Sequence, residues 1–123
     1  MSTISTINPA TEETLQTYDV MSEKEATDRL EACHAAFLEW RGLTHADRAP
    51  YLKNIAQKLR DHAEELADLM TKETGKLLKD GRVEVELCAA LFEYSAENGP
   101  RELADEEREQ ALNGKRGIVS YQP

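Results

Sequence analysis

The chain has 123 residues, of which 40% are hydrophobic and 32% charged, a composition typical of one globular, helix-rich unit. It carries 24 acidic and 15 basic side chains, so its formal net charge is −9. This charge repels nucleic-acid phosphates and anionic membrane surfaces, and we expect neither as a partner. No apolar run is long enough for a membrane span, and residues 1–10 lack a secretory signal, so we expect a cytoplasmic protein.

Residues 2–20 have the pattern of a β-hairpin. Residues 2–7 are rich in β-branched side chains, and residues 14–20 form a second short run that contains apolar residues. Between them, Asn8-Pro9-Ala10-Thr11 favours a turn, whereas β-branched residues favour extended backbone. We therefore predict two antiparallel strands in this region.

A first helix is predicted to begin after Ser22. Ser22 and Glu25 have the spacing of a capping box, which satisfies free N–H groups at a helix start. Apolar residues then recur at alternating steps of four and three, which places them on one helical face. These residues are Ala26, Leu30, Cys33, Phe37 and Trp40. We expect Gly42 to end the helix as its C-terminal cap.

A second capping-box pair, Thr44 and Asp47, precedes the next apolar stripe. Pro50 lies beyond the first helical position, where proline removes a backbone hydrogen bond and disturbs the helix. We therefore predict a short turn before Pro50 and one long helix after it, running to about Thr74. Gly75 is expected to stop that helix.

A third helix is predicted over Lys76 to Asn98. Its apolar residues cover a broad arc, which indicates contact with more than one neighbour. Gly81 weakens the helix near its start by about 1 kcal/mol relative to alanine. Gly99-Pro100 is expected to end it, because proline does not continue a helix.

The last twenty or so residues have the pattern of a second hairpin. Residues 104–109 are predicted to form an acidic, solvated connection, and Asn113-Gly114 is a strong two-residue hairpin turn. The arms would be residues 109–112 and residues 115–121. A final strand without a neighbouring strand would leave its backbone N–H and C=O groups unpaired at an open edge. We therefore expect the strand to pack against protein surface that this chain does not contain.

We find no catalytic constellation in the sequence. Cys33 and Cys88 lie in helical patterns beside alanine and leucine without an activating base, so we expect both to be buried and unreactive. Their separation indicates neither a disulfide framework nor a metal site. His34, His45 and His62 are too scattered for metal binding, and structural roles are expected for them.

Neither of the familiar phosphate-binding patterns is present. Glu73-Thr74-Gly75-Lys76 contains a Gly-Lys pair but lacks the earlier glycine of a P-loop, and no Gly-x-Gly-x-x-Gly occurs. The acidic runs at residues 64–65 and 105–107 are interpreted as solvated faces. We therefore expect no catalytic, cofactor-binding or metal-binding residue in this chain.

A series of short motifs, taken in order, resembles the NAD(P)-dependent aldehyde dehydrogenase superfamily. Residues 7–11, Ile-Asn-Pro-Ala-Thr, look like the family's N-terminal INPATGE signature, although Glu12 stands where the family often has glycine. Leu77 likewise stands where proline is common. Residues 94–100 look most like the succinate-semialdehyde dehydrogenase group. The other matches are Ala35-Ala36-Phe37, Trp40-Arg41, Arg48, Leu59-Arg60, Glu64-Glu65-Leu66-Ala67, Glu73-Thr74-Gly75-Lys76, Arg82, Glu84-Val85 and Tyr121-Gln122-Pro123.

The resemblance implies an α/β fold of which this chain is the N-terminal part only, mainly α-helical with a β-hairpin at each end. Residues 1–103 would be the N-terminal hairpin and three helices at the periphery of the cofactor domain. Residues 104–123 would be a truncated hairpin of the oligomerisation extension. The family oxidises aldehydes with NAD or NADP through a cysteine thiohemiacetal. Its nucleophile, water-activating glutamate, oxyanion asparagine and cofactor glycines all follow the matched region.

Two functions follow from these patterns. The first is an N-terminal fragment of an aldehyde dehydrogenase, inactive alone, whose parent enzyme would oxidise succinate semialdehyde with NAD or NADP. Such a fragment would bind no cofactor itself and would associate with itself or with the missing remainder of the enzyme. The alternative is a non-catalytic helical module that pairs with another protein chain.

Overall fold

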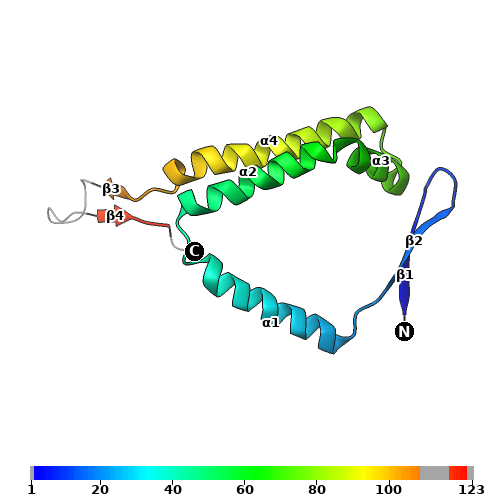
Figure 1. The fold of residues 1–123 in the computed structure, drawn as a ribbon, viewed down its shortest axis with the longest axis horizontal. Helices are drawn as coiled ribbons and strands as arrows, with labels where there is room; N and C mark the ends of the chain where they lie inside the picture. Colours follow the sequence, from blue (N-terminus) through cyan, green and yellow to red (C-terminus); the bar gives the residue numbers. More distant parts are fainter. Residues whose placement is uncertain (1, 109–116, 122–123) are drawn as a thin grey trace.

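The computed structural model describes residues 2–108 and 117–121. Figure 1 shows α2 and α4 side by side, with α1 lying apart from them and a hairpin at each side. The strands form two separate antiparallel two-stranded sheets, so the described chain is mainly helical, as predicted. The elements are β1 (Thr3–Ile7), β2 (Thr14–Asp19), α1 (Glu23–Trp40), α2 (His45–Asp61), α3 (Ala63–Thr74), α4 (Leu78–Glu102), β3 (Glu106–Arg108) and β4 (Gly117–Val119).

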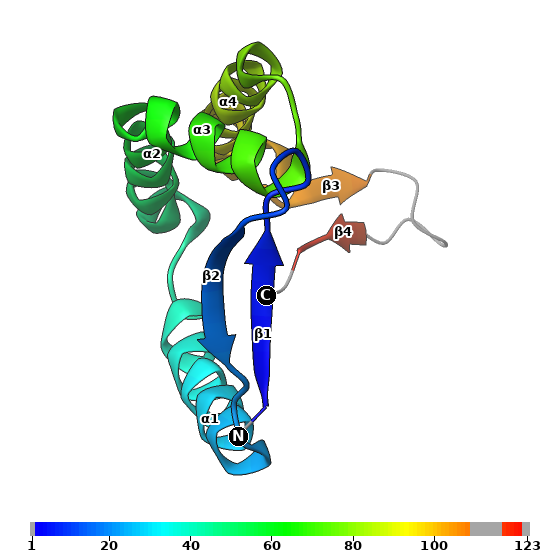
Figure 2. The same cartoon turned by 90° about the vertical axis from the view of Figure 1, so that its right-hand side faces the viewer.

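The N-terminal hairpin is confirmed. β1 and β2 pair in a register that begins with Thr3 opposite Asp19, and a bulge follows Thr6. In the connecting turn the Asn8 side chain accepts a hydrogen bond from the Ala10 N–H at 2.9 Å, the local bond that makes asparagine favourable there. Figure 2 shows this turn beside α3.

Helix α1 begins at the predicted capping box. The Ser22 hydroxyl accepts from the Glu25 N–H at 3.3 Å, and the Glu25 carboxylate accepts from the Ser22 N–H at 2.8 Å. The prediction of Gly42 as the cap is wrong, because the capping residue is Arg41 in right-handed helical conformation. The Gly42 N–H instead donates to the Glu39 carbonyl at 3.1 Å, so a tight turn closes the helix without a left-handed residue.

The predicted break at Pro50 is wrong. The Thr44 capping box starts α2 at His45, and the helix passes through Pro50 to Asp61. Pro50 lies on the exposed side of α2, and Ala46, whose carbonyl loses its helical donor, is exposed as well. Water can therefore bond to that carbonyl, and packing of the opposite face on α4 keeps the helix continuous.

The long helix predicted to reach Thr74 is instead divided at His62. The backbone of His62 has φ −109° and ψ 17°, outside the helical region, and α3 begins at the next residue. This bend allows α3 as well as α2 to pack on α4. Gly75 ends α3 as predicted, with φ 72°, and its N–H donates to the Thr71 carbonyl at 3.0 Å.

Helix α4 is longer than predicted, because it continues through Gly99-Pro100 to Glu102. A side chain on the residue before proline normally clashes with the proline ring, and Gly99 has none. The Leu103 N–H donates to the Gly99 carbonyl at 3.0 Å, which closes the last turn. No helix among the described residues is long and apolar enough to cross a membrane.

The C-terminal hairpin is present, and its described first strand lies within the segment predicted to be a connection. β3 pairs with β4 from Glu106 opposite Val119 to Arg108 opposite Gly117. The strand therefore lies within residues 104–109, which were predicted to be a connection. The predicted turn at Asn113-Gly114 and the predicted arm 109–112 lie outside the described residues.

The buried core is small and consists of short side chains. α2 and α3 both pack on α4, and the buried hydrophobic residues are Ala56, Ala67, Val85, Ala89 and Ala96. The chain exposes 10007 Å² of surface, about 1.5 times the roughly 6,700 Å² expected for a compact 13.9 kDa protein. Helix faces that a compact domain would cover are therefore open to solvent.

Candidate functional site

The densest polar cluster joins α2 to α4. The Arg60 guanidinium donates to Glu86 at 2.9–3.2 Å and to Glu93 at 2.6–2.8 Å, and Lys53 lies 3.6 Å from Glu97. These hydrogen bonds raise the pKa of Arg60 above its usual range and lower the pKa of both glutamates. The two carboxylates accept hydrogen bonds from most of the N–H donors of the Arg60 guanidinium. The cluster therefore fixes the position of α2 along α4 and leaves few donors that could bind a ligand.

A second set of ion pairs joins the start of α4 to α3 and to the preceding turn. Arg82 donates to both carboxylate oxygens of Glu64, with distances of 2.7–3.1 Å, and this lowers the pKa of Glu64. Lys76 pairs with Glu84. The interpretation of residues 64–65 as a solvated face therefore needs refinement, because Glu64 is exposed but also ties α3 to α4.

The three histidines lie at different places in the helical part of the chain. His34 lies on α1, His45 is the first residue of α2, and His62 forms the junction between α2 and α3. The His62 Nδ1 lies 3.0 Å from a carboxylate oxygen of Glu65, one helical turn away. Within residues 2–108 and 117–121, no group of histidine, cysteine and acidic side chains could hold a metal ion.

The prediction that both cysteines are buried is wrong, because Cys33 and Cys88 are exposed. Cys33 lies on the apolar stripe of α1, and α1 has no buried residue. Cys88 borders a shallow hollow on α4 beside Leu91 and Phe92. The apolar neighbours in sequence were read correctly, but no described element covers them. Neither thiol takes part in a hydrogen-bonded pair with a base, so the described contacts show no activated nucleophile.

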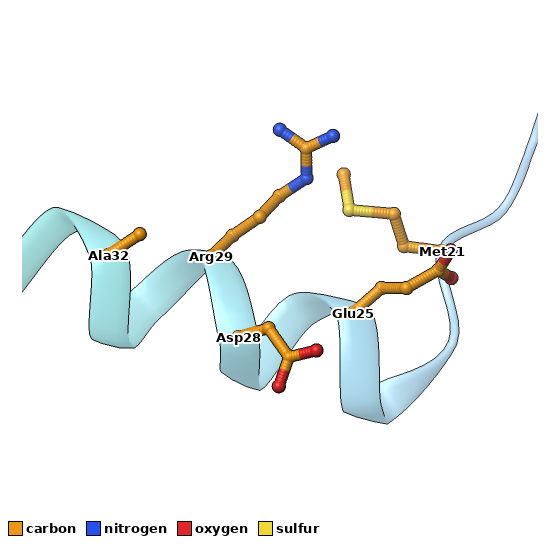
Figure 3. Close-up of a pocket in the computed structure, with 5 residues that line it drawn as sticks. All are labelled: Met21, Glu25, Asp28, Arg29 and Ala32. Atoms are coloured by element: carbon orange, nitrogen blue, oxygen red, sulfur yellow. The ribbon is translucent and has the colours of Figure 1, made fainter.

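One hollow of about 310 Å³ lies at the start of α1 (Figure 3). Figure 3 shows Arg29 and Met21 above the helix, with the Glu25 and Asp28 carboxylates on its side. All of the lining comes from α1 and the residue preceding its cap, so the hollow is the flank of one helix. The Glu25 carboxylate is already bonded to Ser22, which lowers its pKa.

A larger groove of about 400 Å³ lies where the end of α1 and the start of α2 meet the second half of α4. Its walls include Trp40, Leu52, Tyr94 and Pro100. Arg48 also lines it, with its guanidinium 5.7 Å from the Trp40 ring centroid. The Arg48 Nε is buried without a hydrogen-bond partner among the described residues. This groove suits an apolar or planar group, but its lining holds no nucleophile with a base.

Among the described residues, no glycine-rich turn lies at a helix N-terminus. Gly75 is their only glycine with a positive φ, and it lies at the C-terminus of α3. That end of a helix dipole is negative and disfavours phosphate, whereas dinucleotide sites use glycine-rich turns at helix N-termini. Lys76, the cation beside it, is paired with Glu84.

The family model described as "Aldehyde dehydrogenase family" matches residues 1–123. This chain belongs to the aldehyde dehydrogenase family. It is 38% identical to a succinate-semialdehyde dehydrogenase (NADP(+)) of Mycobacterium avium over 122 residues, which are 98% of this chain and 26% of that protein. It is 41% identical over 103 residues to the mitochondrial succinate-semialdehyde dehydrogenase of Oryza sativa subsp. japonica, covering 84% of this chain and 20% of that protein.

Solved structures of the family share the fold. A succinic semialdehyde dehydrogenase from Streptococcus pyogenes, in complex with NADP+, superimposes with a TM-score of 0.83 at 31% identity over 93% of this chain and 25% of that chain. An NADP-dependent enzyme from E. coli gives 0.82 at 32% identity over 95% of this chain and 24% of that chain. This aldehyde dehydrogenase chain thus spans about a quarter of the length of such relatives.

Membership of this family explains why its motifs could be recognised in the sequence although no catalytic or cofactor-binding residue could be identified. Gly75 and Arg60, both in the resembling motifs, serve a helix end and an ion-pair cluster. The motifs of this aldehyde dehydrogenase chain therefore mark structural positions. Sequence reasoning missed the Arg60 cluster, because its three members come from helices separated by the turn at Gly75.

Proposed function

We propose that this chain is the N-terminal, structural part of an NADP-dependent succinate-semialdehyde dehydrogenase. The observation that carries the proposal is its identity of 38% over 98% of its length with the Mycobacterium avium enzyme of that name. The similarity to the Streptococcus pyogenes enzyme solved with NADP+ supports the same substrate and cofactor. We propose NADP and not NAD as the cofactor because of the names of these two relatives.

We also propose that two segments of the chain have different structural roles. Residues 1–103 serve as the helical periphery of a cofactor domain, and residues 104–123 belong to an extension used in subunit contact. The exposed apolar side chains of α1 and α4 support this, because they are suited to lie against further protein. The same exposure fits the alternative function, a helical interaction module.

The 123-residue protein is proposed to be inactive by itself. Its described residues hold neither an activated cysteine nor a phosphate-binding turn. Calorimetric titration with NADP should give no saturable heat, and NADP with succinate semialdehyde should give no NADPH absorbance. Saturable binding or turnover by the isolated protein would refute this part of the proposal.

The positive test is a chimera in which this chain replaces the matching 122 residues of the Mycobacterium avium enzyme. We expect a soluble enzyme that reduces NADP with succinate semialdehyde. The matched control carries Arg60→Glu, which sets like charges against Glu86 and Glu93 and should lower activity through the helix cluster. A folded chimera without any activity would contradict the proposed structural role.

A further inference from the structure

Core packing does not fix the direction of helix α1. Helices α2 and α3 each bury an alanine against α4, whereas α1 buries none of its residues. Figure 1 shows α1 turned away from α2 and α4, with only a short link between its end and the start of α2. The angle between α1 and α2 therefore depends on contacts at this link.

The backbone of the link closes α1 but does not reach α2. The Gly42 N–H donates to the Glu39 carbonyl at 3.1 Å, and the N–H of Leu43 donates to the Trp40 carbonyl at 3.1 Å. Both acceptors belong to α1, and among the described residues no backbone hydrogen bond joins α1 to α2. Glycine also allows more backbone conformations than other residues. Side chains are therefore needed to hold the two helices at one angle.

Arg48, near the start of α2, reaches back to the end of α1. Its Nη2 donates to the Arg41 carbonyl at 3.3 Å. Its Cζ lies 5.7 Å from the centroid of the Trp40 ring, within the range of a cation–π contact. The Trp40 ring also meets the Tyr51 ring edge-on, with 5.2 Å between the two centroids. We call these four residues the α1–α2 junction: Trp40, Arg41, Arg48 and Tyr51.

No carboxylate competes with the junction for Arg48. Arg60 and Arg82 bind glutamates across the helices, but no arginine ion pair among the described residues includes Arg48. The Arg48 Nε is buried and has no hydrogen-bond partner in the described part of the chain. A buried donor without a partner costs free energy, so the contacts with α1 have to offset this cost to keep the guanidinium in place.

We propose that Arg48 sets the direction of α1 relative to α2 and α4, through its contacts with the Trp40 ring and the Arg41 carbonyl. Arg48 is thus a positioning residue for α1. The direction matters because Leu30, on the apolar stripe of α1, is 74% exposed, so the angle of α1 decides how this stripe meets any surface that covers it. A stripe already held at one angle loses less conformational freedom when it is covered. The inference concerns the geometry of this chain and does not depend on its substrate or cofactor.

The N-terminal hairpin is the rival means of holding α1. It precedes α1 directly, and its turn lies beside α3 (Figure 2), where the Pro9 Cγ would be 3.3 Å from a Cβ added at Gly75. A two-stranded hairpin by itself is at best marginally stable in water, and a bulge after Thr6 interrupts the pairing of this one. We therefore expect the hairpin to constrain α1 less than Arg48 does.

Double electron–electron resonance between spin labels on the two native cysteines measures the direction of α1. Cys33 lies on α1 and Cys88 on α4, and both are exposed, so the native chain can be labelled without any substitution. Dilution with unlabelled chain restricts the measurement to distances within one molecule. We expect one narrow distance distribution for the native chain.

Arg48→Met keeps most of the length of the side chain but removes its charge and its donors. A cation–π contact and a hydrogen bond together favour one arrangement roughly tenfold, so the population outside the native distance peak should rise by about that factor. The matched control is Arg41→Met. The Arg41 guanidinium lies over the Phe37 ring within α1, and the carbonyl that accepts from Arg48 belongs to the backbone, so this variant should keep the native distribution.

Pro9→Ala tests the rival and should also keep the native distribution. Far-ultraviolet circular dichroism confirms that each variant retains its helix content. A distribution that Arg48→Met leaves unchanged, or that Pro9→Ala broadens as much as Arg48→Met does, would overturn the proposal.

Fluorescence of Trp40 gives a second readout at the junction itself, because it is the only tryptophan of the chain. Trp40 is 37% exposed, and loss of Arg48 above its ring should increase its quenching by acrylamide. Tyr51→Leu perturbs the same junction from a side chain that is 56% exposed, so it should increase quenching without loss of helix content. Arg41→Met should leave quenching unchanged. If neither Arg48→Met nor Tyr51→Leu changes the quenching of Trp40, the junction does not hold α1.

Discussion

Gly81 lies near the start of α4, where that helix packs closely against Ala67 of α3. A Cβ added at Gly81 would stand 3.2 Å from both the Cα and the carbonyl oxygen of Ala67 and 3.3 Å from its Cβ. Ala67 is itself fully buried. Because two of these atoms are backbone atoms in a packed helix, they can yield only if α3 moves away from α4.

The magnitude of the effect follows from two opposing contributions. Alanine in place of glycine inside a helix ordinarily stabilises by about 1 kcal/mol. Forcing an extra carbon into a filled contact costs about 1–3 kcal/mol. We therefore expect Gly81→Ala to lower the free energy of unfolding by about 1 kcal/mol, and Gly81→Val to lower it further because it adds two more methyl groups.

Urea unfolding followed by circular dichroism measures this change. The control compares Ser95→Ala with Ser95→Gly at an exposed position of the same helix, where both variants lose the hydrogen bond to the Leu91 carbonyl. At this position Ser95→Ala should be more stable than Ser95→Gly by about 0.5–1 kcal/mol. If Gly81→Ala stabilises the chain as alanine does at position 95, the close-approach argument is wrong.

Acid should weaken the packing of α2 on α4. The pKa values of Glu86 and Glu93 are lowered by hydrogen bonds from Arg60, so their contribution to stability is present above the ordinary glutamate pKa of about 4.3 and is lost as pH falls through the lowered folded values. As pH falls below about 4.3, the urea midpoint of the native chain should decrease, and that of Arg60→Gln should decrease less. An equal decrease of the midpoint with pH in both proteins would contradict this. Cys33 and Cys88 should react with a thiol reagent as fast in buffer as in urea, and protection of either thiol in the folded chain would contradict their exposure.

Local sequence determined those parts of the fold that depend on neighbouring residues. Ser22 with Glu25, and Thr44 with Asp47, start α1 and α2 as predicted, because a capping box is complete within four residues. Gly75 ends α3 for an equally local reason, its freedom to adopt a positive φ. The same holds for the turn that begins at Asn8.

Breaks and continuations within the helices were decided by tertiary contacts. No glycine or proline marks His62, where the chain bends so that α3 can join α2 on α4. Pro50 and Pro100, which were predicted to interrupt helices, lie inside them. Their local cost is offset by packing of distant residues, and such packing leaves no signal within a short window of sequence.

Some features of the candidate sites were also evident from the sequence, whereas others depended on the tertiary structure. The absence of a glycine-rich phosphate turn is a property of the sequence and was predicted from it. The exposure of Cys33 was not, since apolar periodicity shows which face of a helix prefers burial but not whether anything covers it. Amino-acid sequence thus determined the two capping boxes, the glycine that ends α3 and the apolar faces of the helices. Only the tertiary structure decided which faces meet, because a contact requires two surfaces brought together by the whole chain.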